Sequence, residues 1–307
     1  MNLPIILKMY SDYLWNKHME ILKELCQAFN YTVNDLSRMI GVDEKEVNAW
    51  INNKSEPELK YYRDMALIFG TSVFHLKNNT GRIVTTSAHY WITQGVMDGF
   101  WGHAGIILNQ SNYTKWYPIS AYEKVKIEDA LVSDSLSLSL ETLNNRLLLI
   151  RKKSIKLLRT LDDASDGTDD WEIDWDDYQG LGCGEIYNLL HEHFDLNDYD
   201  PDLFLDNTSE KAREVISAII NEYNLNSDNY KELIYESIIH HTDGKKTKII
   251  INENCILDLV EQFEDEQTFI RIENYLGDKL YFNFEKLEMI EIPLFLYHNN
   301  QLNDQEK

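Results

Sequence analysis

The stretch "GVDEKEVNAWINNKSEPE", residues 41–58, has the rhythm of a tight turn followed by a short helix. Gly41 stands where a preceding helix ends in a left-handed conformation. Asp43 is placed to cap the next helix, and the acid Glu46 follows three residues later. The inward stripe predicted by helical spacing consists of Val47, Trp50 and Ile51. Charged and polar residues therefore occupy the outward side of this helix.

Further short helices flank this stretch. "NKHMEILKELCQAFN" (16–30) has apolar residues at helical spacing. Thr32 can cap a second helix over "VNDLSRMI", with Asp35 as its capping-box acid. Pro57 can start a fourth helix, and Ser72 caps a final turn. The sequence thus predicts five short helices, with a three-residue turn between the second and the third.

This arrangement resembles the lambda-repressor/Cro-type (XRE-like) helix-turn-helix family over about residues 16–80. The residues that carry the resemblance are Leu36, Ser37, Gly41, Val42, Val47, Trp50, Pro57, Ala66, Gly70 and Leu76. Ser37 replaces the alanine that is usual in the family, a small-for-small change that keeps the close helix crossing. The resemblance implies an all-α domain that binds double-stranded DNA, and it does not extend to the rest of the chain.

In that family, outward residues of the third helix read base edges, and residues near it hold phosphates. Carried over by position, the residues that would read bases are Glu44, Lys45, Asn48 and Ala49. Asn52 would lie near the DNA backbone. The side chains left as phosphate partners are Lys54, Arg38 and Lys60. Asn48 suits adenine, Lys45 suits guanine, and Glu44 accepts only from the amino group of cytosine. Val33 replaces a common glutamine and Glu56 a common basic residue, which leaves few phosphate contacts.

Four acids lie on or beside the face that would meet DNA, namely Glu44, Glu46, Glu56 and Glu58. Two interpretations stay open. Acids in the first turn stabilise a helix through its dipole by roughly 0.3–1 kcal/mol each, or the module serves protein binding instead. Because one module with few phosphate partners would bind DNA weakly, DNA binding implies a homodimer.

Charge divides the chain into two parts. Of its 29 basic and 52 acidic residues, residues 1–80 hold nine and ten, leaving 20 basic and 42 acidic residues for 81–307. The larger part repels nucleic acid and anionic membranes. The three widely spaced cysteines form neither a disulfide framework nor a CxxC metal motif. No apolar run reaches the roughly 18–20 residues of a membrane helix, and no secretory signal is recognised, so the sequence predicts a cytosolic protein without a membrane partner.

The predicted fold class is α+β. The predicted segments are a helix-turn-helix domain (1–80), a β-rich segment (81–160), an acidic loop with helices (161–245) and a second β-rich segment (246–307). The open alternative treats 81–307 as one domain. A polar link, "NNTG" (78–81), can let the helical module project away from the acidic body.

The two β-rich segments predict small antiparallel sheets similar to Sm-like barrels. Strands are expected at Ala104–Leu108 and Lys115–Ile119. Aligning "NNRLLLIRKKSIKLLRTL" with "GDKLYFNFEKLEMIEIPL" suggests a degenerate repeat, with an ordinary meandering sheet as the alternative. Between them, helices are expected over "GEIYNLLHEHF", "SEKAREVISAIINEY" and "NYKELIYESIIHH" (229–241).

Other groups of residues favour no cofactor or metal site. The loop from Asp162 does not match a calcium loop, because Ala164 and Ile173 occupy ligand positions. "GLGCG" (180–184) lacks the lysine of a phosphate-binding loop. The histidine pairs at 191/193 and 240/241 are expected to be exposed, since neighbouring histidines rarely face one ion.

Cys183 at a helix start and His103 at a strand resemble, through "CGEIY" and "HAGI", the order in circularly permuted papain-like cysteine hydrolases. No third, orienting residue is identified, and a structural cysteine and histidine are the alternative. The leading hypothesis is a sequence-specific DNA-binding transcriptional regulator without enzymatic activity. Its acidic C-terminal region would dimerise, sense a signal or bind a partner. A protein-interaction module that binds a basic protein rather than DNA is the second hypothesis, and the hydrolase is the third.

Overall fold

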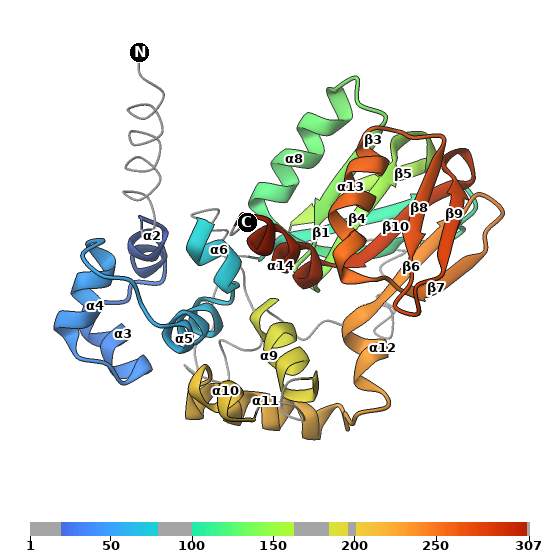
Figure 1. Cartoon of the computed structure of the whole chain (residues 1–307). Coiled ribbons are helices and arrows are strands. Elements are labelled where there is room, and N and C mark those ends of the chain that lie inside the picture. Colours follow the sequence, from blue (N-terminus) through green and yellow to red (C-terminus); the bar gives the residue numbers. More distant parts are fainter. Residues whose placement is uncertain (1–19, 79–99, 163–183, 196–200, 306–307) are drawn as a thin grey trace, which may run out of the picture.

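The structure, a computed structural model, describes residues 20–78, 100–162, 184–195 and 201–305. An all-α module comes first, and a larger α+β body follows it (Figure 1). The fold class predicted from the sequence, a helical region followed by an α+β region with small antiparallel sheets, is confirmed.

Five helices make up residues 20–78. They are α2 (Glu20–Ala28), α3 (Val33–Ile40), α4 (Glu44–Ile51), α5 (Leu59–Phe69) and α6 (Val73–Asn78). Their apolar stripes enclose one core, in which Trp50 is 2% exposed and packs its ring against that of Tyr61. The ring of Phe69 meets the edge of Phe29 across the same core. The predicted helical spacing therefore produces the buried faces that it implies.

The body begins with five strands and one helix, which follow one another in the order ββαβββ. They are β1 (Phe100–Leu108), β2 (Lys115–Ser120), α8 (Ala121–Val132), β3 (Ser137–Glu141), β4 (Arg146–Arg151) and, after the short η1 (Lys152–Ser154), β5 (Ile155–Asp162). Strand β1 pairs with β2 and β5, and β3 pairs with β4, all antiparallel. We call this set the first unit.

The C-terminal part of the body has the same order and the same pairings. Its elements are β6 (Glu236–His241), β7 (Lys246–Ile250), η2 (Glu253–Cys255), α13 (Ile256–Glu264), β8 (Phe269–Glu273), β9 (Lys279–Asn283), η3 (Phe284–Lys286) and β10 (Leu287–Pro293). Strand β6 pairs with β7 and β10, and β8 pairs with β9. The alignment that suggested a repeat sets β4–η1–β5 against β9–η3–β10, so it matches equivalent elements of the two units.

Strand β10 joins the two units. It pairs with β6 of its own unit and with β4 of the first unit, which gives a five-stranded sheet in the order β3-β4-β10-β6-β7. The other described strands form the sheets β2-β1-β5 and β8-β9. The predicted Sm-like barrel is therefore wrong for the described strands, because β10 pairs across the units and neither unit closes on itself.

Five further helices within the described residues pack beside the module and the sheets. They are α9 (Gly184–Asp195), α10 (Pro201–Asp206), α11 (Glu210–Glu222), α12 (Tyr230–Tyr235) and the C-terminal α14 (Leu294–Gln305). Figure 1 shows α14 between the module and the sheets, with α9, α10 and α11 along one side. Their apolar faces and those of the five-stranded sheet form one core cluster, which also contains Leu67 of α5.

Several predicted elements differ from the structure. The helix expected over 229–241 ends at Tyr235, and the chain continues as β6, because Ser237 and Ile239 are fully buried in the middle of the five-stranded sheet. Helices α8, α10 and α14 were not expected. The two strands expected at 104–108 and 115–119 are confirmed within β1 and β2.

The domain boundaries remain a prediction. The five-stranded sheet takes strands from all three segments that the sequence analysis delimits beyond residue 80. This shared sheet favours the alternative in which 81–307 form one domain.

Candidate nucleic-acid interface

Helix α3 is held at its start by the predicted capping box. The side chain of Thr32 accepts a hydrogen bond from the backbone N–H of Asp35 at 3.1 Å, and Asp35 Oδ2 accepts one from the backbone N–H of Thr32 at 2.9 Å. Two backbone donors at the helix start are thereby satisfied. Local sequence alone fixes where this helix begins.

The turn between α3 and α4 is fixed by Gly41 and Ser37. Gly41 adopts a left-handed conformation (φ 74°), and its N–H donates to Ser37 O at 2.8 Å. The hydroxyl of Ser37, a buried side chain, donates to the carbonyl oxygen of Val42. The serine thus does more than preserve a close crossing, because it ties α3 to the turn through a bond that alanine could not make.

Helix α4 begins at the predicted cap. Asp43 Oδ1 accepts a hydrogen bond from Lys45 N at 2.8 Å, and the acids Glu44 and Glu46 occupy the first turn. This placement near the positive end of the helix dipole stabilises both carboxylates. The inward stripe is anchored by Val47, which is fully buried.

The structure places the predicted DNA-contacting side chains on the surface of the module. Six of them are exposed and Ala49 is half-buried; the exposed ones are Glu44, Lys45, Asn48, Asn52, Lys54 and Arg38. The amide of Asn48 donates to Glu44 O at 3.0 Å, and that of Asn52 to Asn48 O at 2.7 Å. These amides must rotate away from the helix backbone before they can meet a base edge or a phosphate.

Helix α4 lies on the outer side of the module, away from the sheets (Figure 1). Its main helix contacts are with α2 and α3. An α-helix with its side chains is about 10–12 Å across, and the major groove of DNA is about 12 Å wide. The outward face is therefore sterically suited to enter that groove.

Comparison with known families supports this geometry. Residues 22–76 match the family model described as Helix-turn-helix, which covers α2 to α6. This segment is a helix-turn-helix domain. The match supports a DNA-binding regulator of the XRE type and double-stranded DNA as its partner. No curated protein and no solved structure matches the chain.

The surface around α4 of the helix-turn-helix domain is not basic. Residues 33–60 carry six acidic and four basic side chains. Arg38 is 78% exposed but lies 3.2 Å from Asp35 Oδ1, and Lys60 lies 2.7 Å from Glu58 Oε2. Both cations are shared with acids of the same domain, so the attraction to phosphate is weaker than their number suggests.

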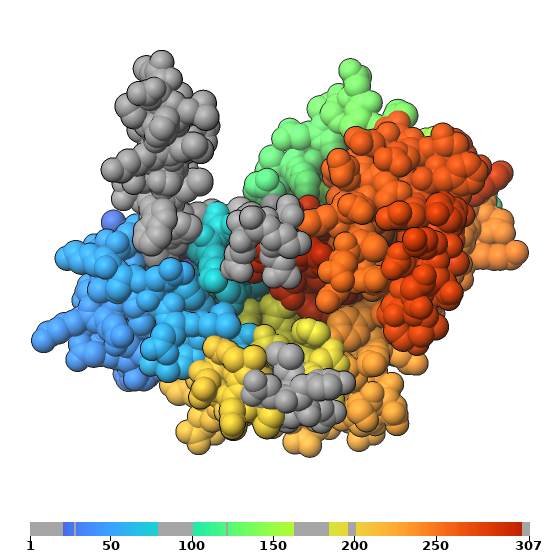
Figure 2. Space-filling model, viewed as in Figure 1, coloured from blue at the N-terminus to red at the C-terminus, as the bar shows by residue number. Residues whose placement is uncertain are grey.

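The opposite face of the domain is docked on the body. In α5 every side chain from Tyr62 to Phe69 is buried, including Arg63 at 4% and Asp64 at 3% exposure. Figure 2 shows the domain abutting the yellow surface of α9–α11. Within the described residues the domain therefore does not project away from the body as the polar link would allow, because its fourth helix belongs to an interface.

Arg63 is the centre of that interface. Its Nε lies 3.3 Å from Glu185 Oε1, and its Nη2 is paired with Glu192 Oε1, both on α9. Its Nη1 donates to Asn207 O and to Thr208 Oγ1, each at 3.2 Å. Burial raises the pKa of Glu185, and the neighbouring Arg63 charge opposes that rise.

A second buried polar contact lies beside it. Ser209, which caps α11, donates from its hydroxyl to Asp64 Oδ1 at 2.5 Å. Burial raises the pKa of Asp64 to about 6, although this hydrogen bond acts in the opposite direction. Lys211 donates to the carbonyl oxygen of Met39 at the end of α3, so α11 also contacts the helix that precedes α4.

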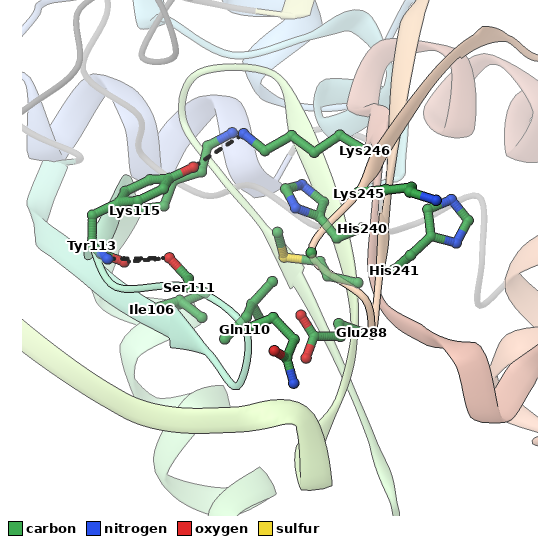
Figure 3. A pocket seen from close by; sticks show the side chains of 13 residues that line it. Ile106, Gln110, Ser111, Tyr113, Lys115, His240, His241, Lys245, Lys246 and Glu288 are labelled. Atoms are coloured by element: carbon green, nitrogen blue, oxygen red, sulfur yellow. Dashed lines mark hydrogen bonds between the residues drawn. The ribbon is translucent and has the colours of Figure 1, made fainter.

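A cavity of about 90 Å³ lies in the body between the β1–β2 and β6–β7 turns (Figure 3). Lys115 Nζ lies 2.9 Å from Glu291 Oε1, and His240 Nε2 lies 2.6 Å from the same oxygen. Burial would raise the pKa of Glu291, but the Lys115 charge and the His240 hydrogen bond hold it well below its usual value. Glu291 neutralises Lys115, and the other lysine and carboxylate side chains that line this cavity are Lys245, Lys246 and Glu288.

The structure describes all four residues of the two histidine pairs. His240 is buried, contrary to expectation, whereas His241 is half-buried and bonds to Thr247 Oγ1 at 2.8 Å. His191 contacts Asp195 at 2.9 Å. Within each pair the side chains have different surroundings, as strand and helix geometry require.

The hydrolase hypothesis is untested. His103 lies in β1 opposite Pro118 and Leu161, but Cys183 lies outside the described residues. Most of the acidic loop, including 163–177, and the "GLGC" glycines lie outside them as well. None of the helices within the described residues is long and apolar enough to cross a membrane.

Proposed function

We propose that this protein is a sequence-specific DNA-binding transcriptional regulator that acts as a homodimer, with α4 as its reading helix. The observation that carries the proposal is that two faces of one domain differ: one is exposed and the other is buried against the body. The outward face of α4 is exposed and points away from the body, whereas α5 is buried against it. A domain held from behind in this way presents its reading helix in a fixed direction.

The proposed base readers are Lys45 and Asn48, which match guanine and adenine in the major groove. Glu44 would add a preference for cytosine. Ala49 would lie against the bases, and Asn52 would lie near the DNA backbone. Arg38, Lys54 and Lys60 are the proposed phosphate partners. With three phosphate contacts per domain, a plot of the logarithm of the DNA-binding constant against the logarithm of the salt concentration should have a slope of about −3 for one domain and about −5 for a dimer.

The experiment is selection of duplexes from a random pool by the full-length protein, followed by affinity measurements on the enriched sequence. Lys45→Ala should weaken binding by about 1–3 kcal/mol. Lys156→Ala, which removes the same charge from an exposed position on β5, is the matched control and should leave binding unchanged. Equal binding by wild type and Lys45→Ala would exclude α4 as the reader.

The acidic surroundings of α4 favour a second candidate function, a protein-interaction module that binds a basic partner. Six acids against four bases in residues 33–60 fit such a partner better than a polyanion. The selection experiment separates the two candidates. Enrichment of no sequence, together with Glu44- and Glu46-dependent binding to a basic polypeptide such as polylysine, would favour the interaction module.

A further inference from the structure

A small cavity of about 50 Å³ lies where the helix-turn-helix domain meets the body. Its walls come from the link between α5 and α6, from the first unit and from α14. Three potential metal ligands line it: His75 of α6, Glu141 at the end of β3 and His298 of α14. One of the three therefore belongs to the domain and two belong to the body.

The three side chains are close enough to share one ion. Their ligand atoms all lie within 4.8 Å of one another, and His298 Nε2 is 3.3 Å from Glu141 Oε2. In a tetrahedral zinc site with bonds of about 2.0–2.2 Å, neighbouring ligand atoms are about 3.4 Å apart. Side-chain movements of roughly 1 Å are thus enough to reach coordination geometry.

Two buried polar atoms at this cavity lack a hydrogen bond within the described structure. His298 is 3% exposed, and its Nε2 makes no hydrogen bond despite the short distance to Glu141, because the approach is misdirected. Thr71 Oγ1, in the link between α5 and α6, is also buried without a partner. Buried polar atoms are nearly always bonded, so two such atoms at one cavity point to a ligand.

The ligand side chains are held in position by their surroundings. The ring of His298 stacks on Phe74 with centroids 4.4 Å apart, and it meets the His75 ring edge-on at 4.7 Å. The backbone N–H of Glu141 donates to the buried Glu123 at 3.2 Å, which fixes the end of β3. Such supporting contacts orient ligands before a metal binds.

We propose that His75, Glu141 and His298 bind one divalent transition-metal ion of the zinc class, with a water molecule completing the coordination. Two imidazoles and one carboxylate suit such ions, whereas Mg²⁺ and Ca²⁺ prefer oxygen ligands. The cavity of about 50 Å³ is large enough to hold a water molecule beside the ion.

The ion would cross-link α6 of the helix-turn-helix domain to α14 and β3 of the body. Metal availability would then determine how firmly the domain is held in its docked orientation, and through it the presentation of α4. This regulatory consequence rests on the proposed function. The binding of the metal does not.

The test measures metal binding by the full-length protein without DNA. The protein is stripped with a chelator and titrated with Zn²⁺, and with Co²⁺ as a spectroscopic probe. We expect one equivalent to bind, a cobalt spectrum typical of nitrogen and oxygen ligands, and a higher Tm with Zn²⁺. His75→Gln and His298→Gln should each weaken Zn²⁺ binding by at least 30-fold, and Glu141→Gln by at least 10-fold.

His241→Gln is the matched control, because it removes an imidazole from the other cavity and should bind Zn²⁺ as the wild type does. If either histidine variant fails to fold, Glu141→Gln still decides the question, because it preserves the shape of a side chain that is 16% exposed. Absence of stoichiometric Zn²⁺ binding by the wild type would overturn the proposal. So would Zn²⁺ binding by Glu141→Gln that equals the wild type.

Discussion

Helices α4 and α5 follow one another in the same domain, yet their charged side chains have opposite surroundings. In α4, Glu44, Lys45 and Glu46 are all exposed. In α5, Arg63 and Asp64 are buried against α9 and α11. A charge in water contributes little to folding but is available to a ligand, whereas a buried charge is costly unless it is paired. Substitutions in α4 should therefore change binding, and substitutions in α5 should change stability.

The largest effect is expected at Arg63. Arg63→Ala leaves the carboxylate of Glu185, itself 1% exposed, without its cation and should destabilise the fold by about 3–5 kcal/mol. Chemical denaturation of the full-length protein measures this change. Arg38→Ala, at an exposed position in α3, is the control and should unfold as the wild type does. If Arg63→Ala lowers the free energy of unfolding no more than Arg38→Ala does, the proposed difference between the buried and the exposed face is wrong.

Asp64 gives a pH-dependent test of the same buried face. Its pKa of about 6 in the folded state lies above its ordinary value of 3.8, so the folded protein binds the proton more tightly. The contribution of Asp64 to stability is then greatest at low pH and falls as pH rises from about 4 to 6. The free energy of unfolding of Asp64→Asn minus that of the wild type should therefore be higher at pH 7 than at pH 4, by up to about 3 kcal/mol.

The difference in stability between Asp64→Asn and the wild type, measured by thermal unfolding between pH 4 and 7, isolates this group. The pKa of Glu185 is also raised by burial, but its effect on the pH dependence of stability is the same in both proteins and cancels in the difference. Glu291 has a lowered pKa, so its stabilising effect is lost only as pH falls below its ordinary value of 4.5. Parallel pH profiles for wild type and variant would contradict the assigned cost of burying Asp64.

The corresponding test on the exposed face uses Asn48. Asn48→Ala should weaken binding to the selected DNA by about 1–3 kcal/mol and relax the preference at one base pair, with the unfolding transition unchanged. Asn221→Ala, on the exposed side of α11, controls for the loss of an amide. A large shift in unfolding with no change in DNA affinity would reverse the roles given to the two helices.

The smallest effect is expected at the cap of α3. Thr32→Ala removes the hydroxyl that accepts from Asp35 N and should cost about 1 kcal/mol of stability. Denaturant unfolding measures this value, and Ser133→Ala, at the end of α8, provides a comparison at a residue that caps no helix start. A cost as large as that of Arg63→Ala would show that local capping, and not docking, dominates the domain.

These contrasts also explain what the sequence predicts and what it leaves undetermined. Thr32, Gly41, Asp43 and Ser209 act on backbone groups within a few residues, so their roles follow from local spacing. Arg63 binds acids more than 120 residues away, and no local pattern separates it from a solvent-exposed arginine. Whether a charge lies in water or in an interface is a property of the assembled fold.

The same reasoning covers the missed elements and the metal-ligand cluster. Helix α8 has weak amphipathic spacing, so only Ser120 and the acid Glu123 three residues later signal its start. The segment after Tyr235 becomes a strand because β7 and β10 lie on both sides of it. His75, Glu141 and His298 are distant in the chain, and only the docking of α6 on α14 and β3 brings them together.

The position of β10 has a consequence for the order in which the chain is made. Strand β4 obtains its second neighbour only from residues 287–293, close to the C-terminal end of the sequence. During synthesis, the sheet of the first unit therefore stays incomplete until β10, which follows β4 by more than 130 residues, has also left the ribosome. In that interval the edge of β4 is open to pairing with another chain. The time between the synthesis of β4 and that of β10 is thus the period in which this protein is most exposed to misassembly.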